Sequence, residues 1–75
     1  MLIDFDLTVG KSDVIVSFEV DIERQGSSLS ALIVDCFVDD KLVSKEARDL
    51  FVKIIGEGDI IDRAATNYFN QEVGA

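Results

Sequence analysis

The sequence predicts an α+β domain in which a three-stranded antiparallel meander sheet is followed by two helices packed on one face (β-β-β-α-α). Three observations predict it. Apolar and polar residues alternate through the first part of the chain, a third apolar run follows a glycine-containing turn, and the remainder carries apolar residues at helical spacing. The 75 residues make one domain, near the lower limit for a self-supporting core.

Residues 2–9 and 14–23 are predicted to form a β-hairpin around a turn that begins at Gly10. Each segment alternates between apolar and polar residues, which is the pattern of a half-buried strand. Pairing Val9 with Val14 makes the apolar faces of both strands coincide, whereas a slip of one residue would put acids into the core. We therefore expect this register.

Residues 29–38 are predicted to form the third strand, and both of its faces are largely apolar. We assign its even-numbered residues from Leu32 to Val38 to the core face. The other face is expected to add an apolar patch to the outer side of the sheet, where a second copy of the chain could pack. This patch consists of Ile15, Ile33 and Phe37.

Residues 44–55 and 59–70 are predicted helices. Ser44 and Asp59 are good N-caps, and Gly56 stands where the first helix should end. Each helix has one apolar stripe, which we expect to cover the sheet. The stripes are Ala47, Leu50, Phe51, Ile54 and Ile55 in the first helix, and Ile61, Ala64, Ala65, Tyr68 and Phe69 in the second.

The composition argues against catalysis and against a bound cofactor. The chain has no histidine, which is the commonest general base and zinc ligand. Its one cysteine, Cys36, is expected to be an inert core thiol. Residues 56–58 lack the lysine and hydroxyl residue of a phosphate loop, and Asp35, Asp39 and Asp40 lack the spacing of a calcium loop. We expect no enzymatic activity, no cofactor and no dedicated metal site; a domain that binds calcium or magnesium weakly through these aspartates is a further, less favoured interpretation.

The sequence favours the cytoplasm. A single cysteine cannot form an internal disulfide, and small secreted domains usually depend on several. No stretch approaches the roughly 18 apolar residues of a membrane span, and the first residues do not resemble a signal peptide. The net charge of −8 opposes direct binding to nucleic acid and to anionic membranes.

The surplus of acids is concentrated in the first half of the chain. Residues 1–42 hold nine acids and three bases, and residues 43–75 hold six acids and four bases. The expected hairpin places Asp4 opposite Glu19, and carboxylates about 5 Å apart repel each other by roughly 0.8 kcal/mol in water. The outward positions of the first two strands hold five acids with no lysine or arginine between them: Asp4, Asp6, Glu19, Asp21 and Glu23.

Two functions of different classes agree with this pattern. In the leading hypothesis the chain is a small acidic binding protein that docks these five acids on a basic protein surface and inhibits its partner by blocking a nucleic-acid-binding site, as inhibitors of host defence do. In the alternative it is a homo-oligomeric structural or adaptor module, such as a homodimer, that assembles through the patch on the third strand. A third interpretation is that the acids only keep the sheet soluble.

Overall fold

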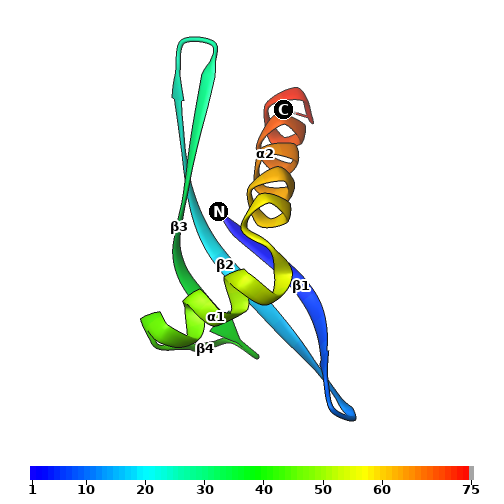
Figure 1. Ribbon diagram of the computed structural model, residues 1–75. Coiled ribbons are helices and arrows are strands. Elements are labelled where there is room, and N and C mark those ends of the chain that lie inside the picture. The colour runs from blue at the N-terminus through cyan, green and yellow to red at the C-terminus, as the bar shows by residue number, and fades with distance from the viewer. Residues whose placement is uncertain (75) are drawn as a thin grey trace.

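The computed structural model describes the backbone of residues 1–74 and the side chains of residues 1–71. Its sheet is antiparallel with the strand order β1-β2-β3-β4, and both helices follow the sheet in the chain (Figure 1). The predicted α+β fold is confirmed, with a short fourth strand in addition. The elements are β1 (Leu2–Val9), β2 (Ser12–Gln25), β3 (Ser28–Val38), β4 (Lys41–Leu42), α1 (Lys45–Ile55) and α2 (Glu57–Gly74).

All three connections between strands are two-residue turns. Gly10 and Gly26 open the first two turns with φ angles of 63° and 62°, and a positive φ at the first position is typical of type II′ turns. Asp39 and Asp40 make the third turn with φ angles of 48° and 68°, the type I′ pattern. These turns are tighter than the sequence suggested, so β2 begins at Ser12 and β3 follows directly on the second turn.

The register of β1 and β2 differs by two residues from the predicted one. Val9 pairs with Ser12, whereas the sequence predicted Val14 as its partner. A shift of two residues keeps every side chain on its face, so the apolar pattern satisfies both registers equally. The two-residue turn at Gly10 decides between them, because it brings Val9 and Ser12 together at the end of the hairpin.

A bulge at Val34 divides β3 into two halves. Ile33 and Asp35 pair with consecutive residues of β2, so Val34 between them has no partner on that strand. One extra residue reverses the faces of the strand on the far side of the bulge. Leu32 therefore points outward, and Ile33 packs against the core. The predicted faces of residues 29–33 are wrong for this reason.

The core lies between one face of the sheet and the two helices. The buried hydrophobic side chains come from β1, β2, β3 and α2, and the ring of Phe5 packs edge-on against that of Phe18 with centroids 5.9 Å apart. Phe51, Val52 and Ile55 of α1 pack against this cluster. Its fully buried members are Ile3, Val16, Phe18, Val20, Cys36, Ile60 and Ala64.

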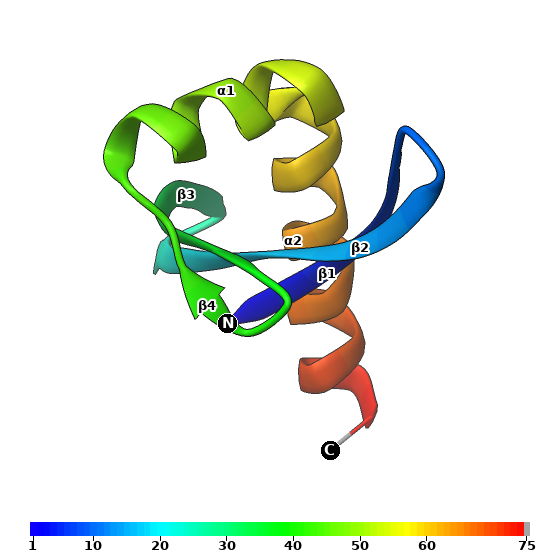
Figure 2. The ribbon, with the colours of Figure 1, turned by 90° about the horizontal axis from the view of Figure 1, so that it is seen from below.

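Gly56 joins the two helices directly. The predicted N-cap of α1 is confirmed, because the Ser44 hydroxyl accepts a hydrogen bond of 3.2 Å from the backbone N–H of Ala47. Gly56 has a φ of 105° and its carbonyl accepts from the N–H of Ile60 at 3.1 Å, so it ends α1 and also begins α2. Asp59 therefore lies in the first turn of α2, and its predicted capping role is wrong. Figure 2 shows the two helices running in different directions from this point.

The buried stripes of the helices are partly displaced from the predicted ones. Leu50 and Ile54 of α1 are exposed, at 57% and 54%. In α2 the fully buried isoleucine is Ile60, and Ile61 is only half-buried. The displacement follows from the start of α2 at Glu57, which turns Ile60 toward the sheet together with Ala64, one helical turn later. Neither helix of the described part is long and apolar enough to cross a membrane.

Candidate partner-binding face

The face of the sheet that points away from the helices carries the candidate site, and we call it the outer face. Side chains alternate along a strand, so the even residues of β1 and the odd residues of β2 share this face. All five predicted acids lie on it. The structure adds three that the sequence analysis did not include, so the outer-face acids are Asp4, Asp6, Asp13, Glu19, Asp21, Glu23, Asp35 and Asp40.

The outer face carries a surplus of acids as large as the net charge of the chain. It holds eight of the fifteen acids, and the other seven acids equal the seven lysines and arginines in number. Within the described strands, no lysine or arginine stands at an outer-face position. The described strands therefore present a uniformly acidic outer face, whose eight acids equal the net charge of −8 in number.

The pairs of neighbouring side chains on this face differ from those predicted. Asp4 lies opposite Ser17, whose hydroxyl donates a hydrogen bond of 2.6 Å to its carboxylate. Glu19 lies opposite Leu2 on one side and Asp35 on the other. The predicted pairing of Asp4 with Glu19 is therefore wrong. The two acids that lie directly opposite each other are Glu19 of β2 and Asp35 of β3.

Glu19 has a cationic neighbour at the start of the chain. The ammonium group of Met1 donates to a carboxylate oxygen of Glu19 at 3.0 Å and to the Val20 carbonyl at 3.2 Å. The Met1 carbonyl in turn accepts from the Val20 N–H at 2.8 Å, which continues the ladder of β1 and β2 by one residue. Glu19 is therefore the least suitable of the outer-face acids for a charge-reversal experiment.

Apolar side chains lie among the acids. Of the predicted patch, Ile15 and Phe37 are on the outer face, but Ile33 is not, because the bulge turns it toward the core. Leu32 takes its place at 65% exposure. Leu42 also joins this face, although the sequence did not predict it there, because β4 pairs it with Phe37. Asp39 and Asp40 could have indicated β4 in the sequence, because aspartate is common in two-residue hairpin turns.

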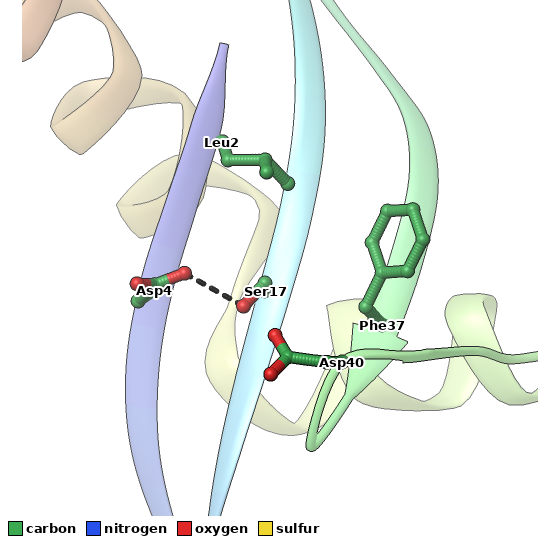
Figure 3. A pocket seen from close by; sticks show the side chains of 5 residues that line it. All are labelled: Leu2, Asp4, Ser17, Phe37 and Asp40. Atoms are coloured by element: carbon green, nitrogen blue, oxygen red, sulfur yellow. Dashed lines mark hydrogen bonds between the residues drawn. The ribbon is translucent and has the colours of Figure 1, made fainter.

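A shallow hollow of about 320 Å³ lies in the outer face. Its five lining residues come from β1, β2, β3 and the turn before β4: Leu2, Asp4, Ser17, Phe37 and Asp40. Figure 3 shows the carboxylate of Asp40 at the edge of β2, close to Ser17, and the ring of Phe37 on the neighbouring strand β3. Ser17 is only 7% exposed and makes the floor of the hollow.

Two arginines from the helices contact the edges of the sheet. Arg63 of α2 donates to the Asp4 carbonyl of β1 at 2.9 Å, and its guanidinium carbon lies 4.6 Å from the centre of the Phe5 ring. Arg48 of α1 donates to the Val34 carbonyl at the bulge of β3 at 2.7 Å. Both carbonyls would otherwise be open hydrogen-bonding groups at the edge of the sheet, because β4 pairs only with Phe37 and Val38 and leaves the rest of β3 uncovered.

The described residues show no catalytic arrangement. Cys36 is buried, and burial raises the pKa of its thiol, although the charge of Arg48 opposes the shift. A neutral, inaccessible thiol is a poor nucleophile. Among residues 1–71, no three carboxylate or thiol groups gather closely enough to hold a metal ion.

Comparison of this chain with protein-family models, with curated proteins and with solved structures finds no match. The candidate site is accordingly defined by its own geometry. It is an uncovered sheet face that carries eight acids, several exposed apolar side chains and one hollow.

Proposed function

We propose that this protein is a non-enzymatic binding module that docks its outer face on a basic surface of a partner protein. The observation that carries the proposal is the gathering of eight acids on that face, where the described strands place no lysine or arginine. A protein that needed charge only for solubility would gain as much from acids and bases spread over all sides, at a smaller cost in repulsion. A single-sign face attracts and orients an oppositely charged partner.

The exposed apolar side chains support an interface in direct contact with the partner. Leu2, Leu32 and Leu42 are more than half exposed on the outer face. Their burial by a partner would be favourable, at about 25 cal/mol for each Å² removed from water. The acids then supply attraction and selectivity, and the leucines supply part of the affinity.

The partner surface we propose is one that otherwise binds a short run of phosphates. Acids two residues apart on a strand are about 6.6 Å apart, so Glu19, Asp21 and Glu23 of β2 follow one another at regular intervals over about 13 Å. Docking there would exclude the nucleic acid and inhibit the partner.

A homo-oligomer remains the alternative, and the electrostatics of the face oppose it. Two copies that met through their outer faces would bring sixteen carboxylates together, because each copy contributes eight. Light scattering after size exclusion tests this directly. A dimer at low ionic strength would favour self-assembly over a basic partner, since like charges should then prevent association.

The test of the proposal compares two variants that have the same net charge. In the first, Asp21→Lys and Glu23→Lys reverse two exposed acids of the outer face; in the second, Glu46→Lys and Asp62→Lys reverse two exposed acids of the helices. Each variant and the original protein serve as bait in a lysate of the native cell, and circular dichroism verifies that both variants are folded. Neither pair includes Glu19, which contacts Met1.

The proposal requires one captured protein whose binding depends on where the charge was reversed. Its affinity should fall by at least about tenfold with the outer-face variant and change little with the helical variant. It should also fall with salt, and a short oligonucleotide should compete for the same purified partner. Equal losses with both variants would show that overall charge, and not this face, governs binding.

A further inference from the structure

The hollow in the outer face presents polar atoms that accept hydrogen bonds. The carboxylates of Asp4 and Asp40 only accept when they are ionised. The Ser17 hydroxyl could donate, but it already donates to Asp4 over 2.6 Å. Toward a ligand, the Ser17 hydroxyl can therefore only accept hydrogen bonds. The complement of this hollow is therefore a group that donates hydrogen bonds and accepts none.

Neither carboxylate is neutralised within the described part of the chain. Among residues 1–71, no lysine or arginine pairs with Asp4 or Asp40. Asp40 occupies its position with a φ of 68°, a left-handed conformation in which a two-residue turn usually has glycine. The turn thus holds a charged side chain over the floor of the hollow (Figure 3).

Two of the five side chains that line the hollow, Leu2 and Phe37, are apolar. Leu2 is 58% exposed, and the half-buried ring of Phe37 stands beside Asp40. The volume of about 320 Å³ is at the lower end of the range of about 300–1,000 Å³ for small-molecule sites. A space of this size suits one long side chain, whose stem contacts Leu2 and whose cationic end reaches the carboxylates.

On the other side of the sheet, the protein holds one of its own guanidinium groups between an aromatic ring and a strand carbonyl. Arg63 lies over the ring of Phe5 at 4.6 Å and donates to the Asp4 carbonyl at 2.9 Å. An aromatic ring beside strand oxygens therefore accommodates an arginine in this fold. The hollow combines the ring of Phe37 with two carboxylates, which are stronger acceptors than a carbonyl.

We propose that the hollow receives an arginine side chain of the basic partner, an inference that rests on the proposed function. A guanidinium offers five N–H donors and no acceptor, stacks on aromatic rings and forks between carboxylates. A lysine ammonium gains less, because it is a compact and strongly hydrated charge. The hollow thus fixes the position of the partner, and the rest of the outer face attracts it.

Two peptides of equal charge test this inference: pentalysine, and pentalysine with its central residue replaced by arginine. Both are titrated into the isotopically labelled protein at low salt, and amide chemical shifts report the affinity and the site. We expect the arginine peptide to bind about three- to tenfold more tightly, with the largest shifts at Ser17 and Phe37. Phe37→Leu and Asp40→Asn should remove this preference, and Asp40→Asn should weaken the binding of pentalysine only as much as the loss of any other outer-face charge.

The matched control is Asp21→Asn, which removes one outer-face charge that does not line the hollow. It should weaken both peptides equally and keep the preference for arginine. Equal affinities of the two peptides for the original protein would overturn the inference and leave the proposed function standing. So would a preference that survives Phe37→Leu and Asp40→Asn together. If neither peptide binds at low salt, the proposed function itself fails.

Discussion

The opposition of Glu19 and Asp35 predicts that this fold becomes more stable when one of the two charges is removed. The two residues are directly paired between β2 and β3, where Cα atoms are about 5.5 Å apart. Carboxylates about 5 Å apart in water repel by roughly 0.8 kcal/mol, and exposed pairs measured in proteins give about 0.2–1 kcal/mol. The Met1 ammonium, 3.0 Å from Glu19, cancels part of the repulsion. Asp35→Asn should therefore raise the free energy of unfolding by about 0.5 kcal/mol at low salt.

Urea unfolding followed by circular dichroism measures this gain. With a slope of about 1 kcal/mol per M for a domain of this size, the midpoint should rise by about 0.5 M. In about 1 M salt, where the Debye length is about 3 Å, most of the gain should disappear. Asp49→Asn is the matched control, because Asp49 is exposed and accepts from Arg48 at 3.1 Å, so its neutralisation should not stabilise. A lower midpoint for Asp35→Asn at low salt, or a gain unaffected by salt, would refute the reasoning.

Three further predictions follow from burial and hydrogen bonding. Ile60→Ala should cost about 2–5 kcal/mol of stability in a urea titration because Ile60 is fully buried, whereas Ile61→Ala should cost clearly less; equal costs would contradict the observed face of α2. Cys36 should react with Ellman's reagent only as fast as the protein opens, and immediate labelling would contradict its burial. Burial raises the pKa of Cys36 above the usual 9.0, so the folded thiol stays protonated at pH values where the unfolded thiol ionises. The free energy of unfolding should therefore fall as the pH rises above 9.0, and the Cys36→Val variant should not show this contribution to the fall. Ser17→Ala removes the hydrogen bond to Asp4 and should lower the unfolding free energy by about 1–2 kcal/mol; a neutral effect would show that water replaces it.

The alternation of residues was sufficient for the fold class and for the five predicted acids. A period of two assigns Asp4 and Asp6 to one face whatever the exact register, because a shift of two residues leaves the faces unchanged. The neighbours across the strands were not predictable from this pattern. They depend on the length of the turn at Gly10, which the residue types alone left open.

The apolar part of the site was harder to predict, because it depends on a break in the alternation. Val34 has no partner on β2, and this one extra residue turns Leu32 outward and Ile33 toward the core. The residue types around the bulge are all compatible with a regular strand, so the sequence does not reveal it. Asp40 enters the site only through the turn that starts β4. The alternation pattern predicts only that Asp40 lies at the end of a strand. It does not predict that the turn places this side chain beside β2.

The contacts of Arg48 and Arg63 with the edges of the sheet have a consequence for synthesis. All four strands precede both helices in the chain, so the ribosome releases a complete sheet before either arginine is in place. During this interval the edge carbonyls of Asp4 and Val34 are open to the strands of other nascent chains, as is the apolar face of the sheet. The acids of β1 and β2 are already present at that stage and repel such chains. The charge of the outer face thus opposes association between unfinished chains.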